Sequence, residues 1–186
     1  ILRGFEANRV LLVVDGVRMN NAIYRSGHLQ NAITVDPNIL DRTDVLLGPN
    51  SILFGSDAMG GVIHYHTRTP RVSNRGLKTR VSTAFRSPNQ STMVHGDVEC
   101  SGRNWATLTS FSHARYGDLR MGKWRIHGDA TWGLDSVYVA RENGTDHVRI
   151  NEDANVQLGS GYDQTDFLQK LRYQTHRGVW DLNLQW

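Results

Sequence analysis

The 186-residue sequence lacks features that several common protein classes require. It contains a single cysteine, Cys100, which excludes an internal disulfide and any metal site built from several cysteines. It has no run of 18 or more apolar residues, which excludes a transmembrane helix. Its net charge of +3 is small and scattered along the chain, so we expect no nucleic-acid partner.

The two ends of the sequence also lack the usual terminal features. The chain begins at Ile1 without Met and without the basic and apolar regions of a signal peptide. It ends at Trp186 in the middle of an alternating pattern. We therefore expect the chain to be a fragment of a longer protein.

Glycine and aromatic residues are abundant, which is unusual for a helical bundle. The densest glycine cluster lies in Ile39–Thr67, which reads ILDRTDVLLGPNSILFGSDAMGGVIHYHT. So many glycines over a short stretch indicate tight turns or a close approach of two backbones. Val45–Leu47 and Val62–Tyr65 are predicted to be strands, and Asn50 can cap a single helical turn that runs through Phe54.

The residues before this cluster predict the rest of a small α/β domain. Arg9–Val17 is a nearly continuous apolar run closed by Asp15-Gly16, as expected of a buried central strand that ends in a tight turn. Arg18–Asn31 is polar and rich in turn residues, so we expect a surface loop there. Asp36-Pro37 predicts the start of a short helix that ends near Arg42.

From residue 77 onward the sequence alternates with a period of two. Apolar or threonine positions recur at every second residue in segments about ten residues long, with polar and charged residues between them. The first segment contains Leu77, Val81 and Phe85, and the last contains Trp180 and Leu182. This pattern is typical of transmembrane β-barrel strands, but a soluble antiparallel sheet with one solvated face would produce the same alternation.

A long polar segment at about residues 117–163 interrupts this alternation and has no sustained period. Such a connection would be unusual in a compact soluble domain. In an outer-membrane barrel, long connections lie on the extracellular side and short turns on the periplasmic side. The segment therefore favours a barrel, in which Tyr173, Trp180 and Trp186 are candidates for the aromatic girdles at the membrane interface.

Three segments, Leu2–Phe5, Leu11–Val17 and Ile39–Ile63, resemble in order and spacing the plug domain of the TonB-dependent outer-membrane receptors. These receptors import iron complexes and cobalamin into Gram-negative bacteria. One departure is Leu47, which stands where the family usually has a basic residue before Gly-Pro. The resemblance therefore implies nothing about a role for that charge.

The resemblance implies the domain organisation. Residues 1–69 would be the C-terminal part of a small α/β plug domain, and residues 70–76 a connector. Residues 77–186 would be about the first five antiparallel strands of a truncated barrel of about 22 strands, with residues 117–163 as a long extracellular loop.

The resemblance also implies transport rather than catalysis. It places the protein in the outer membrane, in contact with lipid and with the TonB energy-transducing complex, whose contact segment is missing from this chain. The residues themselves contain no set of nucleophile, base and orienting group, so we expect neither an enzyme nor a catalytic cofactor.

A finer resemblance lies in Arg25–Asp36, RSGHLQNAITVD, which is similar to a plug loop of the haem and haemoglobin receptors within the family. In those receptors the histidine is an axial ligand of the haem iron, a role that neutral imidazole performs well. The matching residue is His28, and Tyr24 and Arg25 are candidate ligand-binding neighbours in the same apical loop. Gln157–Gln164 also resembles a segment of these receptors.

The cargo implied is therefore haem or a haem protein, and two alternatives stay open. One is a ferric siderophore or another nutrient carried by the same family. The other is a different class, a soluble β-rich binding or adhesion protein. His64 and His66, at i and i+2 on one face of a strand, could bind a metal, but such a pair is more often a wet contact between plug and barrel wall.

Overall fold

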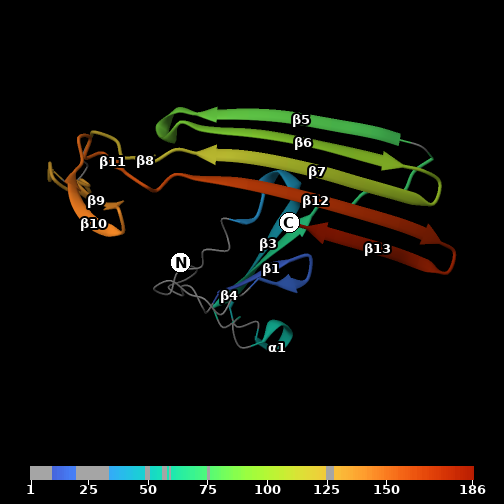
Figure 1. The fold of residues 1–186 in the computed structure, drawn as a ribbon. Coiled ribbons are helices and arrows are strands. Elements are labelled where there is room, and N and C mark those ends of the chain that lie inside the picture. The colour runs from blue at the N-terminus through green and yellow to red at the C-terminus, as the bar shows by residue number, and fades with distance from the viewer. Residues whose placement is uncertain are drawn as a thin grey trace. The chain divides into compact units, whose positions relative to one another are not determined.

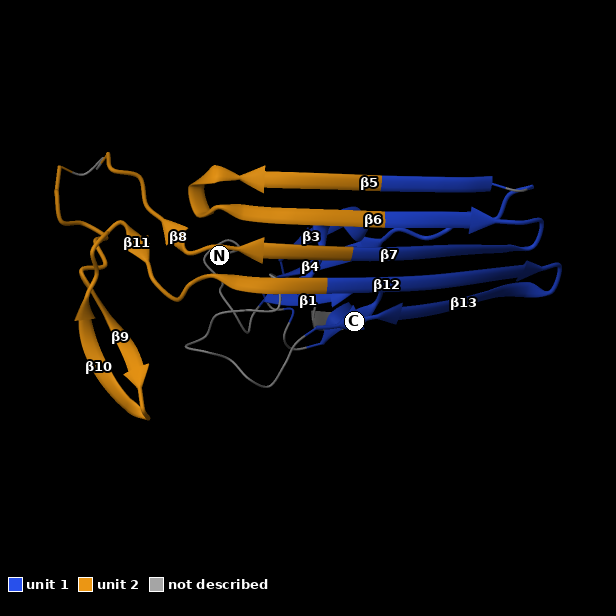
Figure 2. Cartoon of the chain, turned by 45° about the horizontal axis from the view of Figure 1, so that its top comes forward, with its two compact units in different colours: residues 1–80, 97–111, 166–186 blue, residues 81–96, 112–165 orange. Residues whose placement is uncertain are grey.

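The computed structural model describes residues 10–19, 34–48, 51–55, 58, 60–74, 76–124 and 128–186. The chain divides into two compact units, coloured separately in Figure 2. The first consists of Ile1–Arg80, Asp97–Phe111 and Asp166–Trp186, and the second of Val81–Gly96 and Ser112–Thr165. Among the described residues, no helix has the length and hydropathy needed to cross a membrane.

A four-stranded sheet forms the centre of the N-terminal domain (Figure 1). Its strands, in the order β2-β1-β4-β3, are β1 (Val10–Val14), β2 (Val17–Arg18), β3 (Leu40–Leu47) and β4 (Gly61–Thr67). The inner strand β1 is parallel to β4, and all five of its residues are buried. Leu11, Val13, Ala58 and Val62 form the core beside Phe54. The predicted central strand is therefore confirmed.

Two short helical segments flank β3. The 3-10 helix η3 (Pro37–Ile39) begins at Asp36, whose carboxylate accepts a hydrogen bond from Asn38 N at 2.9 Å. The predicted start is confirmed, but the predicted end near Arg42 is wrong. The strand β3 already begins at Leu40, because pairing of Leu40 with Thr67 of β4 extends the sheet into the expected helix. Helix α1 (Ser51–Phe54) confirms the helical turn, whereas its predicted cap, Asn50, lies outside the described residues.

The remaining long strands form one antiparallel sheet in the order β13-β12-β7-β6-β5. Its members are β5 (Gly76–Arg86), β6 (Ser91–Ser101), β7 (Trp105–Tyr116), β12 (Tyr162–Thr175) and β13 (Gly178–Gln185). The 3-10 turn η5 (Ser87–Asn89) joins the first two strands. These are the five strands that the alternation predicted, and β5 and β13 form the two edges of a barrel wall that stays open in this chain.

The alternation predicted from sequence separates the two faces of this wall. Trp180, Leu182 and Leu184 are each more than half exposed on one face of β13. On β7 the residues that point to the other face are buried, and Leu108 is the large apolar residue among them that interrupts the expected polar face. Leu108 packs with Leu168 of β12 and with Ile39 of the N-terminal domain. The irregularity in the pattern therefore marks a contact between the wall and that domain.

The long segment after β7 contains regular structure that the sequence pattern did not indicate. β9 (Val137–Glu142) and β10 (Thr145–Ile150) form a hairpin, and β8 (Leu119–Arg120) pairs with β11 (Val156–Gln157). The turn of the hairpin is Asn143-Gly144, with φ values of 51° and 83°. Both residue types tolerate positive φ, and Asn-Gly is a strong hairpin signal. The strands are only six residues long, too short to stand out in a pattern dominated by longer ones.

Candidate functional site

A turn in the N-terminal domain carries Asp15, a carboxylate with several hydrogen-bond donors. Asp15 follows β1 in a tight turn with Gly16, at φ values of 47° and 86°. Its side chain accepts a 2.8 Å hydrogen bond from Thr67 N and a short one from Thr67 Oγ1, at the end of β4. The turn therefore holds Asp15 in place before any residue of the barrel wall contributes.

Strands of the wall supply the other donors to Asp15. Lys170 Nζ on β12 lies 2.9 Å from Asp15 Oδ2, and Asn183 Nδ2 on β13 lies 3.0 Å from the same oxygen. Gln185 Nε2 approaches it at 3.4 Å. The side chains of Lys170 and Asp15 are 9% and 21% exposed, so water screens their attraction only weakly. One carboxylate thus ties the N-terminal domain to two neighbouring strands.

The protonation of Asp15 depends on these donors. Burial acts to raise its pKa, but hydrogen bonds from Thr67 and Lys170, together with the charge of Lys170, outweigh burial and lower the pKa. The group is therefore ionised at neutral pH. The stability it contributes is present above its ordinary pKa of 3.8 and is lost only as the pH falls through its lower folded value.

A second carboxylate, Asp97 on β6, is buried between two arginines. Arg80 Nε on β5 donates to Asp97 Oδ2 at 2.8 Å. Arg68, after β4, donates to Oδ1 at 3.2 Å, and its other terminal nitrogen forms a close ion pair with Oδ2 at 2.9 Å. Arg80 also donates to the carbonyl of Asn38 at 2.8 Å. This network is a second polar tie between the N-terminal domain and the wall.

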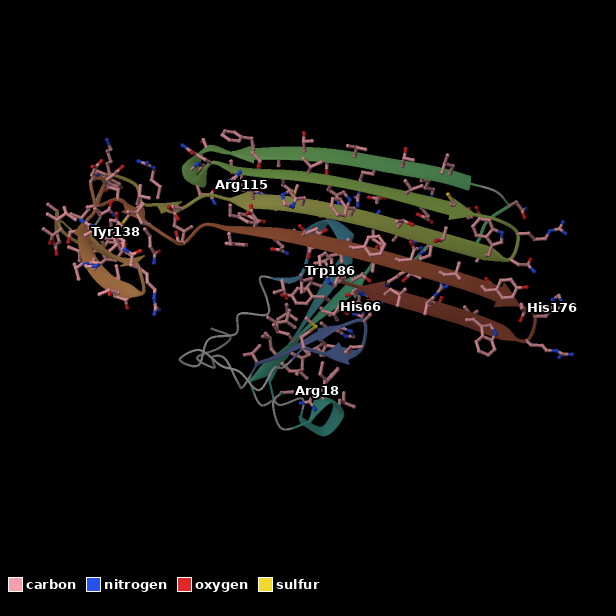
Figure 3. All side chains as sticks on the ribbon, in the orientation of Figure 1. Arg18, His66, Arg115, Tyr138, His176 and Trp186 are labelled. Atoms are coloured by element: carbon pink, nitrogen blue, oxygen red, sulfur yellow. The ribbon has the colours of Figure 1, made fainter. Side chains whose placement is uncertain are left out.

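His64 and His66 of β4 line a cavity of about 500 Å³ together with Asp15, Lys170 and residues of β12 and β13. Their ring centroids are 3.9 Å apart. His66 Nε2 lies 2.8 Å from Asp44 Oδ2, and His64 Nε2 accepts a hydrogen bond from the backbone of the turn at 3.2 Å. Figure 3 labels His66. Across the part of the chain that the structure describes, no three His, Cys, Asp or Glu side chains are grouped to hold a metal ion.

We expect acidification to weaken this part of the fold. Burial, and then the nearby ring of His66, lower the pKa of His64 below its ordinary value of 6.5. The unfolded chain therefore takes up a proton first, and the free energy of unfolding falls as the pH drops through 6.5 toward the folded value. Denaturant unfolding between about pH 8 and pH 5 measures this dependence. His64→Phe should flatten the profile, whereas His147→Phe on the exposed β10 should not; equal profiles in both variants would contradict the prediction.

The structure does not test the residues that the sequence singled out as ligands. His28, Tyr24 and Arg25 lie outside the described residues. The residues that it brings together instead are Asp15, Lys170 and the Asp97 network, none of which the sequence identified as functional. The sequence contained one sign of the role of Lys170. This residue shares the polar face of β12 with Leu168, and a large apolar residue on that face indicates that another domain covers it.

Comparison with known proteins supplies the family context. The TonB-dependent Receptor Plug Domain model matches residues 1–62. A hemin receptor of Yersinia enterocolitica is 42% identical over 66 residues, which cover 36% of this chain and 9% of that protein. A vitamin B12 transporter, BtuB, of Vibrio vulnificus is 44% identical over 72 residues, 39% of this chain and 11% of the transporter.

Two further similarities extend beyond these residues. A ferrioxamine receptor of Yersinia enterocolitica is 36% identical over 139 residues, which cover 72% of this chain and 19% of the receptor. The solved FrpB iron transporter of Neisseria meningitidis superposes with a TM-score of 0.64 at 19% identity, over 91% of this chain and 22% of that one. The chain thus spans about a tenth to a fifth of the length of these proteins, and the similarity to FrpB supports the fold alone.

Proposed function

Because the chain belongs to the TonB-dependent receptors, we propose that the receptor carrying it imports a nutrient across the outer membrane of a Gram-negative bacterium. The observation that carries this proposal is the set of hydrogen bonds and ion pairs around Asp15, which ties the plug to strands of the barrel wall. Water can replace polar contacts of this kind at little net cost, whereas a continuous apolar interface would resist separation. A plug held in this way closes the barrel and can still be released.

In this proposal the chain works as a gate and not as an enzyme. Cargo binds on the outer loops of the plug, and the TonB complex supplies the force that remodels it. Release requires the separation of Lys170 from Asp15 and of Arg80 from Asn38. No covalent bond is made or broken, and no catalytic cofactor is needed.

The exposed face of the wall supports a membrane location over a soluble β-rich binding protein. Leu77, Trp180 and Leu182 are 69%, 73% and 52% exposed on strands whose outward positions carry large apolar side chains interspersed with threonine. Large exposed apolar side chains on one face of the strands are what a barrel presents to lipid.

For the cargo, we propose haem or the haem of a haem protein. The support is the similarity of Arg25–Asp36 to the haem-binding plug loop, together with the 42% identity to a hemin receptor. In this reading His28 binds the haem iron from the plug, and Tyr24 and Arg25 contact the porphyrin or its propionates. A neutral imidazole has the chemistry for this role.

A ferric siderophore is the second candidate cargo. The match to the ferrioxamine receptor covers 72% of this chain, twice the share covered by the match to the hemin receptor. The vitamin B12 transporter, 44% identical over 72 residues, is as similar to this chain as the hemin receptor is. These similarities therefore identify the family and do not discriminate between the cargoes. The two proposals differ in the role of His28, which binds the haem iron in the first and has no such role in the second.

Replacement of His28 by Ala distinguishes them. If His28 is an axial ligand, His28→Ala in the full receptor should lower haem affinity by at least about tenfold, shift the Soret band and slow growth on haem iron. Heat-modifiable migration of each variant serves as a control for folding, and His147→Ala as a control for histidine loss elsewhere. An unchanged Soret band with unchanged growth on haem would remove His28 from the site and favour the siderophore.

A further inference from the structure

Three aromatic side chains form a row across neighbouring strands of the wall, within the first unit. Tyr173 of β12 lies directly opposite Trp180 of β13. The backbone N–H of Gln174 donates to the carbonyl of Asn104 at 2.8 Å, which brings the start of β7, and with it Trp105, beside Tyr173. The three rings are 44–73% exposed on the same outward face. Tyr173 and Trp180, two of the three residues predicted for the aromatic girdles, are therefore neighbours across two strands.

The row separates two kinds of surface. Along the strands in one direction, Leu171, Leu182 and Leu184 are exposed at outward positions of β12 and β13. Gln169, on the same face, is hydrogen-bonded to the hydroxyls of Thr107 and Thr109. In the other direction lie the short turns, with Arg103 before β7 and His176-Arg177 between β12 and β13 (Figure 3 labels His176). Aromatic residues between an apolar band and polar turns mark the level of lipid headgroups.

The two turn arginines differ from Arg172 and Arg149, which are paired. Arg172 pairs with Asp181 at 2.7 Å, and Arg149 pairs with Glu142 at 2.9 Å. Within the described part of the chain, the guanidinium groups of Arg103 and Arg177 pair with no carboxylate. Two unpaired positive charges on adjacent turns give this end of the strands an excess of positive charge that can attract an anion.

A hollow beside Arg103 gives these charges a shaped surface. It has a volume of about 720 Å³ and is lined by Asn74, Ser101, Gly102, Arg103 and Trp105. The indole of Trp105 lies over Gly102, where a Cβ atom would be 2.6 Å from its Nε1. Glycine at this position therefore lets the indole fold over the turn and form one side of the hollow.

We propose that these turns bind the headgroup of an anionic phospholipid. The guanidinium groups of Arg103 and Arg177 hold the phosphate, which matches the paired donors of arginine. The row of Trp105, Tyr173 and Trp180 holds the glycerol and ester region, and the hollow receives the remainder of the headgroup. The site rests on the outer-membrane location proposed above and assigns these short turns to the periplasmic leaflet.

The test uses the full receptor in phosphatidylcholine vesicles that contain either brominated phosphatidylglycerol or brominated phosphatidylcholine. Bromine quenches tryptophan at short range, so the ratio of the two quenching efficiencies reports the preference for the anionic lipid. We expect the wild-type receptor to prefer phosphatidylglycerol. In the double variant R103Q/R177Q, the preference for phosphatidylglycerol should fall by roughly fivefold for each arginine removed. Inorganic phosphate in solution should not compete with the lipid for the site.

The control R141Q/R149Q removes two charges from the β9–β10 hairpin and should retain the preference. Both pairs of arginines are exposed, so heat-modifiable migration should confirm folding in every variant. An equal preference in R103Q/R177Q and wild type would overturn the site, as would competition by free phosphate. Quenching by neither lipid would overturn the outer-membrane location itself, and the site with it.

Discussion

Replacing Lys170 with Met should destabilise the docked plug by about 3 kcal/mol, because it leaves the Asp15 carboxylate partly buried without its cation. This value is at the lower end of the destabilisation observed when one partner of a buried ion pair is removed, because Asp15 keeps the hydrogen bonds from Thr67 and Asn183. Methionine has a similar volume, so the loss reports charge and not a cavity. The measurement is the denaturant midpoint of the full receptor in detergent.

A double-mutant cycle separates this pair from its surroundings. Asp15→Asn combined with Lys170→Met removes both charges and should recover part of the loss. The matched control is Arg172→Met, which breaks the more exposed pair with Asp181 on the same strands and should cost less than about 1 kcal/mol. A loss in Lys170→Met no larger than in Arg172→Met would show that the contact with Asp15 does not hold the plug.

The second large effect is expected at Asp97. Its side chain is only 4% exposed, and it is the counter-charge for Arg68 and Arg80. Asp97→Asn should cost about 3 kcal/mol, because the guanidinium of Arg68, 23% exposed, remains between β4 and the wall without a carboxylate. Asp163→Asn, which removes the partner of exposed Arg115 at 3.8 Å, should cost less than about 1 kcal/mol.

The variants Asp97→Asn and Asp163→Asn can be compared in one unfolding experiment on the full receptor. Equal denaturant midpoints for the two would contradict a role for Asp97 in holding the N-terminal domain against the wall. A further variant, Arg80→Gln, should lie between them. It loses the hydrogen bond to Asn38 as well as the ion pair, but its side chain is 48% exposed and can be rehydrated.

The features of this fold that depend on local chemistry could be predicted from the sequence. The apolar run of β1, the Asp-Gly turn and the period of two each reflect the backbone or one face of a strand, and each is confirmed. The helix predicted to reach Arg42 ended early because pairing with a distant strand, β4, was stronger than the local signal.

The candidate site was harder to predict because it depends on contacts between distant segments. Asp15 and Lys170 are separated by 155 positions in the sequence, and nothing local to either residue indicates the other. Leu108 and Leu168 gave the available hint, since each is a large apolar residue on a face that otherwise carries small or polar residues. The cargo ligands stay predictions, as His28 lies outside the described residues.

The small cluster of Ile39, Leu108 and Leu168 also constrains the order of assembly. Leu108 and Leu168 come from neighbouring strands joined by a long loop, so they form one surface only after β7 and β12 have paired. Closing that loop costs chain entropy that later contacts must recover. We therefore expect the wall to form first and Ile39 to pack against it afterwards, so that docking of the plug depends on prior pairing of β7 and β12.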